Sequence, residues 1–225
     1  MSRSIGPAPG PVASQENPCR LLRQMTILAS ELMAEEQRAD VQTRLTRIIQ
    51  DNSKRIERMV HDVLELGRRD RCTPETIPLE GFVAAFLADS EAYEALTPGL
   101  VGYDGQPGLS IRFDRIHLQQ LLWNLVGNAR RFCSGARDSI RIEARWLDDG
   151  HVRLCVLDDG PGIPLEMRSR IFEPFFTTDS RGTGLGLYIA RELASANEGQ
   201  LELRETRSGA CFCLTAEGAN EFFKE

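Results

Sequence analysis

Arg181-Gly-Thr-Gly-Leu-Gly-Leu187 sets three glycines two residues apart directly before a helical pattern that continues to Ala196. Glycine allows positive φ and close approach of the backbone to a ligand, and free N–H groups at the start of a helix attract phosphates. A second glycine-rich stretch, Asp158-Asp-Gly-Pro-Gly-Ile-Pro164, lies upstream. Two such stretches can form the floor and the lid of one nucleotide pocket.

A helix predicted over residues 118–132 adds polar side chains to this pocket. Asn124 and Asn128 are four residues apart and Arg131 follows three residues later, so the three side chains share one side of the helix. Mg²⁺ prefers oxygen ligands, so one Asn oxygen together with triphosphate oxygens suffices, and Arg131 can balance phosphate charge. Asp158 ends an apolar strand, where its carboxylate can accept a hydrogen bond from the adenine amino group. The combination predicts a Mg-ATP site.

Composition argues against several other classes of function. A net charge of −6 gives no electrostatic basis for direct nucleic-acid binding. The sequence shows neither a signal peptide nor an apolar run of the roughly 20 residues that a membrane helix needs, which predicts a cytoplasmic protein without a membrane span. Six cysteines without a C-x-x-C pair favour reduced core thiols over a disulfide framework or a zinc site.

The chain divides into a lead, a helical pair and a larger domain. Residues 1–18 are proline-rich and predict a flexible lead, whereas residues 19–70 carry two amphipathic helical stripes separated by a polar turn. A hairpin cannot cover its own stripe, so we expect residues 19–70 to dimerise into a four-helix bundle. The alternative is that these helices simply pack on the neighbouring domain, residues 71–225.

Residues 71–225 mix helical and strand patterns. Helices are predicted over residues 79–96, 114–132 and 185–196, with Asp114 as the N-cap of the second. Strands are predicted over residues 109–113, 140–146, 152–156, 201–203 and 210–214, with a hairpin turn at Asp148-Asp-Gly150. This order predicts an α/β sandwich with helices on one face of a mixed sheet, so that the chain as a whole is α+β.

Together, the motifs resemble those of sensor histidine kinases. The ATP-binding domains of these kinases belong to the same superfamily as those of gyrase and the heat-shock chaperones. The resemblance covers about residues 19–217 and extends to the kinases that control type IV pilus genes. Four motifs carry it: Asn124-Leu-Val-Gly-Asn-Ala-Arg-Arg-Phe132 is similar to the N box, Asp158-Asp-Gly-Pro-Gly-Ile163 to the first glycine box, Ile171-Phe-Glu-Pro-Phe-Phe-Thr-Thr178 to the F box, and Gly182-Thr-Gly-Leu-Gly-Leu187 to the second glycine box.

The resemblance implies a role for each part of the pocket. Asn128 would bind Mg²⁺, Asn124 and Arg131 the phosphates, Phe132 the adenine surroundings and Asp158 the adenine amino group. Residues 171–181 would form a mobile lid. The other residues implied in ATP binding come from the glycine boxes and the lid: Gly160, Gly162, Thr178, Gly182, Thr183, Gly184, Leu185 and Gly186.

The phosphoacceptor histidine that the resemblance implies is missing from its position. In the family the first hairpin helix opens with His-Glu-x-x-Asn-Pro, and here Asn17-Pro18 is retained while Ala13 and Ser14 occupy the first two places. An imidazole is nucleophilic near neutral pH, whereas alanine offers no nucleophile. The first helix therefore reads as a degenerate phosphoacceptor.

Three histidines remain in the chain. His61, followed by Asp62 on the second helix, is the one conceivable substitute acceptor, and a solvated helix position is the alternative. We expect His117 and His151 to lie at the surface.

The leading hypothesis is a protein-histidine kinase type of phosphotransferase that binds Mg-ATP and acts in a two-component phosphorelay. Its partners would be a second copy or a full-length kinase in a mixed dimer, which supplies the acceptor in trans, and a response regulator. The alternative is a catalytically silent pseudokinase that regulates a kinase or response regulator. A serine kinase of the anti-sigma-factor type is a third possibility, which the helical pair disfavours, and a truncated copy of a longer sensor gene is a fourth.

Overall fold

The computed structural model describes residues 23–28, 42–50, 52, 53, 56, 60, 72–92, 96–179 and 182–219. Residues 23–28 and 42–50 are helical, in agreement with the helices predicted there. Their pairing into a hairpin and its dimerisation stay predictions. His61 and the lead over residues 1–18 lie outside the described residues. Within the described part, none of the helices combines the length and apolar character that crossing a bilayer requires.

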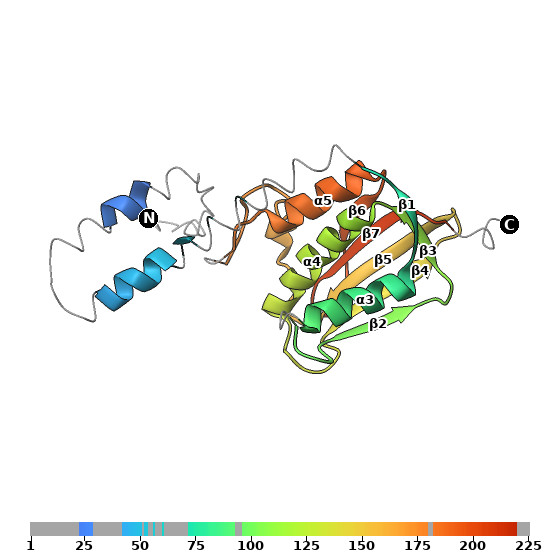
Figure 1. The fold of residues 1–225 in the computed structure, drawn as a ribbon, viewed down its shortest axis with the longest axis horizontal. Helices are drawn as coiled ribbons and strands as arrows, with labels where there is room; N and C mark the ends of the chain where they lie inside the picture. Colours follow the sequence, from blue (N-terminus) through green and yellow to red (C-terminus); the bar gives the residue numbers. More distant parts are fainter. Residues whose placement is uncertain are drawn as a thin grey trace, which may run out of the picture.

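The described chain from Cys72 onward is built on a five-stranded mixed sheet (Figure 1). Only the first pair of neighbouring strands is parallel; the other pairs are antiparallel. In spatial order the strands are β2 (Val101–Gly105), β4 (Ile140–Trp146), β5 (His151–Asp158), β7 (Cys211–Glu217) and β6 (Gln200–Arg204). A separate antiparallel pair joins β1 (Glu75–Pro78) to β3 (Ser110–Phe113). The mixed sheet confirms the predicted class.

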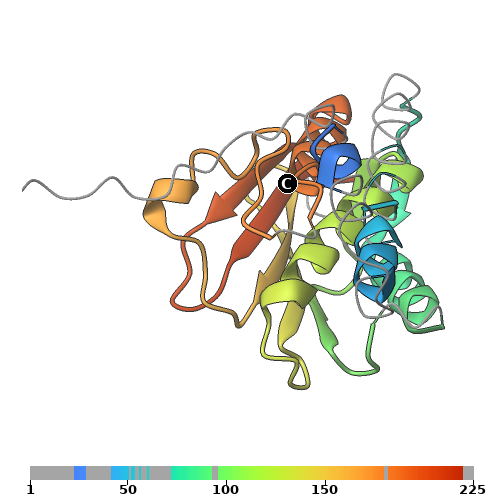
Figure 2. The same cartoon turned by 90° about the vertical axis from the view of Figure 1, so that its left-hand side faces the viewer.

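Three helices cover one face of this sheet, as the two views together show (Figures 1 and 2). They are α3 (Leu79–Ala92), α4 (Arg115–Phe132) and α5 (Gly186–Ala196), and a 3₁₀ helix, η2, spans Leu165–Met167. Alternate residues of β5 such as Val152 and Leu154 belong to the same buried core as Leu121 and Leu125 of α4. Every second residue of the strand and every third or fourth residue of the helix face inward, and these side chains pack into one core.

Helix α3 and two short strands differ from the prediction. Helix α3 ends at Ala92 rather than at residue 96. The N–H of Leu96 donates a hydrogen bond to the carbonyl of Ser90 at 3.1 Å, which satisfies one of the carbonyl groups at the end of the helix. Strands β1 and β2 were not predicted. Both are short, and β2 is an edge strand with two glycines, so neither shows a clear alternation of apolar residues.

A buried polar junction ties the start of the domain to α4 and α5. Asn197, 7% exposed, accepts hydrogen bonds through Oδ1 from the N–H of Asp114 at 2.7 Å and from Cys72 Sγ at 3.2 Å. Its Nδ2 donates to the carbonyl of Leu193 at 2.8 Å and lies 3.0 Å from Nδ1 of His117. The prediction that His117 is a surface residue is therefore wrong: its first-turn position on α4 turns it toward the end of α5, and it is 4% exposed.

Asp114 is the N-cap of α4, as predicted, and its capping bonds make a pH-dependent contribution to stability. Oδ1 accepts from the N–H groups of Ile116 and His117, and Oδ2 from the N–H and hydroxyl of Thr73. Burial alone would raise the pKa of Asp114, but the hydrogen bonds from Thr73 and His117 outweigh it and lower that pKa below its ordinary value. This stabilisation is present above the unfolded pKa of about 3.9 and is lost as pH falls through the lower folded pKa.

Replacing Asp114 by alanine is expected to cost about 1–2 kcal/mol of unfolding free energy at neutral pH, the usual effect of losing an N-cap. Asp114→Asn is the matched control, since an amide oxygen can still cap the helix but does not titrate in this range. Urea unfolding of both variants and the wild type from neutral pH down to acid would test this. Equal acid dependence in the wild type and Asp114→Asn would contradict the assignment.

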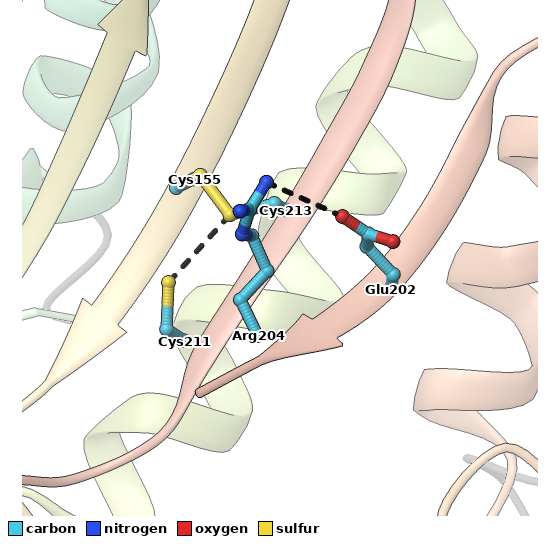
Figure 3. The surroundings of a disulfide bond; sticks show 5 residues. All are labelled: Cys155, Glu202, Arg204, Cys211 and Cys213. Carbon is cyan, nitrogen blue, oxygen red and sulfur yellow. Dashed lines mark hydrogen bonds and ion pairs between the residues drawn. A yellow bond between two sulfur atoms is a disulfide. The ribbon is translucent and has the colours of Figure 1, made fainter. Parts of the chain in front are cut away.

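The cysteines on the other face of the sheet also differ from the prediction. Cys155 of β5 and Cys213 of β7 are direct cross-strand partners and form a disulfide, so the expectation of reduced thiols alone is wrong for this pair (Figure 3). Two cysteines opposite each other in an antiparallel pair are near enough to bond, which the linear sequence does not reveal. Cys72, Cys133 and Cys211 are free thiols.

Candidate functional site

A cavity of about 320 Å³ lies between α4, the end of β5 and the segments on either side of η2 and before α5. Most of the residues predicted for the ATP site line it: Asn124, Asn128, Arg131, Phe132, Asp158, Gly162, Thr178, Thr183, Gly184 and Gly186. Residues as far apart in the sequence as Asn124 and Gly186 thus share one cavity.

Three predicted residues do not line the cavity. Leu185 is 2% exposed and packs with Ile189 and Leu193 in a core cluster of α5, because it precedes that helix on its buried side. Gly160 and Gly182 lie in the supporting loops, where the N–H of Gly160 donates to Asp158 Oδ1 at 2.9 Å and that of Gly182 to the carbonyl of Asp179 at 2.9 Å. Their contribution is to the shape of the loops.

Asp158 presents a carboxylate that the backbone holds in place. It ends β5, is 8% exposed, and its Oδ1 accepts hydrogen bonds from the N–H groups of Gly160 at 2.9 Å and Ala210 at 3.1 Å. Among the described residues no hydrogen bond reaches Oδ2. One oxygen of a fixed carboxylate is therefore left for a hydrogen-bond donor in the cavity, as an adenine amino group would be.

The adjacent Asp159 fixes the first glycine-rich loop to the end of α4. It accepts from the Ser134 hydroxyl at 2.6 Å and the Ser134 N–H at 2.8 Å, and these bonds lower the pKa of its carboxyl below the ordinary value. Asp158 and Asp159 thus have different partners although they are neighbours. Asp159 serves the loop, whereas Asp158 faces the cavity.

Asn124 carries a buried amide group that is suited to binding a ligand. Its Nδ2 is buried, and the part of the chain that the structure describes offers it no hydrogen-bond partner. An unsatisfied buried amide donor costs about 1–3 kcal/mol, so such groups are retained where a ligand or metal-bound water completes them. Gly186 keeps this amide clear, because a Cβ at position 186 would lie 3.3 Å from Asn124 Oδ1.

Two glycines allow close backbone packing around the cavity. Gly184 has φ +72°, and a Cβ there would lie 2.5 Å from the carbonyl carbon of Phe175. Gly209, with φ +71°, approaches the carbonyl oxygen of Asp158 so closely that a Cβ would overlap it. Sequence reasoning missed Gly209, although Ser208-Gly209 between two predicted strands is a recognisable turn signal.

The predicted lid contributes one wall of the cavity. Phe176, Thr177, Thr178 and Asp179 line it, and Arg131 NH1 lies 3.9 Å from Asp179 Oδ2. Arg170 stacks 4.6 Å above the Phe176 ring and pairs with Glu173 at 3.3 Å. Residues 180 and 181 lie outside the described part, and the mobility of this segment stays a prediction.

The cavity also has an apolar wall that the sequence reasoning largely missed. Trp123, Ile163, Met167, Ile171, Leu187 and Ala210 line it alongside the predicted polar groups. Met167 lies in η2, which no sequence pattern predicted, and Ala210 was predicted only as the first residue of a strand, without a role in the site. An apolar wall with a few fixed polar groups suits a flat heteroaromatic ring at one end and a charged tail at the other.

The residues present therefore fit a magnesium nucleotide. Asn128 offers an amide oxygen suited to Mg²⁺, Asn124 an unpaired donor, and Arg131 a cation for phosphate. Comparison with known proteins agrees: the sequence model of the "Histidine kinase-, DNA gyrase B-, and HSP90-like ATPase" family matches residues 113–219. Residues 113–219 are therefore similar to the ATPase domain of that family.

Relatives of this ATPase domain include sensor kinases. The chain is 36% identical over 199 residues to the Sensor protein kinase PilS of Pseudomonas aeruginosa, a match that covers 83% of the chain and 36% of PilS. The chain thus spans about a third of the length of that relative. The homologous proteins are sensor histidine kinases, and the chain is consistent with a two-component sensor kinase.

Solved structures show the same fold. The Acinetobacter baumannii histidine kinase AdeS matches with a TM-score of 0.62 at 19% identity, covering 89% of this chain and 98% of that one. Full-length ShkA, solved in complex with AMPPNP, matches with a TM-score of 0.60 at 28% identity, covering 88% of this chain and 46% of that one.

Proposed function

We propose that the chain binds Mg-ATP in this cavity and transfers the γ-phosphoryl group to a histidine within a two-component phosphorelay. The observation that carries the proposal is one cavity that joins the fixed carboxylate of Asp158 to the unpartnered amide of Asn124. The complex of ShkA with a non-hydrolysable ATP analogue supports it.

The residues divide between the two ends of the nucleotide. Asp158 Oδ2 accepts from the adenine amino group beside the apolar wall, and Asn124 and Arg131 bind the phosphates. Asn128 holds Mg²⁺, which supplies charge neutralisation when bound. Thr178, Thr183, Gly184 and Gly186 complete the phosphate end. The remaining task of the protein is to position ATP and exclude water, which is the main protein contribution in phosphoryl transfer.

The acceptor histidine comes from a second protein in this proposal, because Ala13 stands at the acceptor position. Transfer breaks the bond between the γ-phosphorus and the β,γ-bridging oxygen, forms a bond from phosphorus to an imidazole nitrogen, and releases ADP. A full-length kinase in a mixed dimer would supply this histidine, and a response regulator would receive the phosphoryl group. A second copy could dimerise with the chain but would bring Ala13 to the same position. Because ATP is a cytoplasmic substrate, the activity belongs in the cytoplasm.

The test is to give the chain its own acceptor. The double variant Ala13→His, Ser14→Glu, incubated with Mg²⁺ and γ-labelled ATP, is expected to acquire label that is acid-labile and base-stable, while the wild type acquires none. Adding Asn128→Ala to the double variant is expected to reduce labelling by at least about tenfold, because the proposed metal ligand is lost. Mass spectrometry of the labelled protein locates the phosphohistidine.

Other outcomes separate the alternatives. Label on the wild type that disappears in His61→Ala would make His61 the acceptor. Saturable ATP binding without label on any variant would contradict the kinase proposal and favour a pseudokinase that regulates its dimer partner. Absence of ATP binding would overturn the kinase proposal and leave a silent pseudokinase that does not use the nucleotide.

A further inference from the structure

Three cysteines form a cluster on the face of the sheet opposite the helices. Cys155 is 9%, Cys211 7% and Cys213 0% exposed, and they make a small core of their own with Leu157. Their neighbours in sequence, such as Val156 and Phe212, belong instead to the main core under the helices. The alternation of side chains along β5 and β7 therefore places all three sulfurs on one face (Figure 3).

The register of the sheet brings the sulfurs together. Cys213 is the cross-strand partner of Cys155 on one side and of Glu202 on the other, while Cys211 is the partner of Arg204. The sulfurs of Cys211 and Cys213 are 3.6 Å apart, and all three sulfurs lie within 4.8 Å of one another. A metal ion bonded to sulfur at about 2.3 Å needs sulfurs roughly 4 Å apart. The Cys211–Cys213 distance is already close to this, and the bonded sulfurs of Cys155 and Cys213 would reach it by moving apart after reduction.

We propose that this cluster, once its disulfide is reduced, binds one soft d¹⁰ metal ion such as Zn²⁺, Cd²⁺ or Cu⁺ through the thiolates of Cys155, Cys211 and Cys213. Thiolates select soft ions over Mg²⁺, so the cluster would not compete for the metal of the nucleotide cavity. The cysteines lie on the face of the sheet away from the helices, although Cys211 directly follows Ala210 of the cavity wall. The proposal does not depend on the proposed kinase activity.

Nearby charges suit a metal-bound form better than free thiolates. Three thiolates around a divalent ion carry a net charge of −1, which the guanidinium of Arg204 can offset. Arg204 also pairs with Glu202 at 3.6 Å, so the guanidinium is held along the same strand (Figure 3).

Both chemical steps balance. A water-soluble phosphine reduces the Cys155–Cys213 disulfide: two S–H bonds form, and the phosphine becomes a phosphine oxide whose oxygen comes from water. Metal binding then replaces three S–H bonds by three sulfur–metal bonds and releases three protons. The disulfide and the metal-bound form exclude each other, because two of the three ligands are consumed by the S–S bond.

Cadmium is the probe for the test. The full chain is reduced with the phosphine, freed of reductant under anaerobic conditions and titrated with Cd²⁺, while the ultraviolet charge-transfer absorption of cadmium thiolate and the released protons are measured. We expect saturation at one ion per chain with about three protons released per ion below the thiol pKa. No saturable absorption, or fewer than three protons per ion, would overturn the proposal.

Matched variants locate the site. Replacing Cys19, Cys72 and Cys133 together by serine leaves the cluster intact and is expected to preserve both readouts. Cys211→Ser is expected to weaken cadmium binding by at least on the order of 100-fold, because one of three thiolate ligands is lost. Cadmium affinity in Cys211→Ser equal to that of the wild type would refute the assignment. If that variant unfolds without metal, the proton count of the triple serine variant still decides the number of thiolates.

Discussion

Replacement of Asp158 by asparagine is expected to weaken ATP binding by about 5- to 150-fold, the equivalent of about 1–3 kcal/mol for a mismatched buried donor. Asparagine keeps one oxygen for the N–H groups of Gly160 and Ala210. It replaces the second oxygen by an NH₂ group. This group and the adenine amino group are both hydrogen-bond donors, so no hydrogen bond could form between them. Calorimetric titration with Mg-ATP in the two proteins measures the effect.

Guanine nucleotides provide a second readout for Asp158→Asn. Guanine carries a carbonyl oxygen where adenine carries its amino group, so the new NH₂ group would gain an acceptor. The ratio of GTP to ATP affinity is therefore expected to rise. Asp159→Asn is the matched control, because Asp159 bonds Ser134 and does not line the cavity. Unchanged ATP affinity in Asp158→Asn would show that this carboxylate does not contact the base.

Replacement of Gly209 by alanine is expected to lower the unfolding free energy by about 2–4 kcal/mol. Alanine disfavours the positive φ at this position, and its Cβ would be overpacked against the neighbouring backbone. Its φ is +71°, and the added Cβ would overlap the carbonyl oxygen of Asp158, which is backbone and cannot rotate away. The ends of β5 and β7 would have to separate there. The melting temperature is expected to fall by roughly 5–15 °C.

Gly150→Ala separates the two causes of this loss. Gly150 also has positive φ, +85°, but a Cβ there would meet nothing within 4 Å. This control is expected to cost only about 1 kcal/mol. Differential scanning calorimetry of both variants tests the difference. Similar losses at positions 150 and 209 would mean that contact with Asp158 adds nothing to the backbone cost.

Sequence patterns predicted the elements whose periodicity is strong. The apolar stripe of α4, its cap at Asp114 and the β4–β5 hairpin with its turn at Gly150 all follow from local rules. The same motifs predicted Asn124, Asn128 and Asp158 as neighbours in one cavity, because glycine loops and a polar helix face have few other uses in that order.

Features set by tertiary contact could not be predicted in this way. Asn197 becomes a buried bridge only because α5 ends against the start of α4, and the Cys155–Cys213 bond depends on strand register. The apolar wall of the cavity is assembled from residues without a shared pattern, such as Trp123 and Met167. A lone edge strand such as β2 likewise takes its structure from its neighbour β4.

The junction at Asn197 also fixes how short an independently folding piece of this protein can be. The family match begins at residue 113, yet the Asp114 cap is completed by Thr73, and Ile77, Leu79 and Val83 upstream are fully buried. A fragment cut to residues 113–219 would leave the apolar surface under α3 bare to solvent and would be prone to aggregate. A fragment made for crystallisation or for fusion to another protein should therefore begin no later than Cys72.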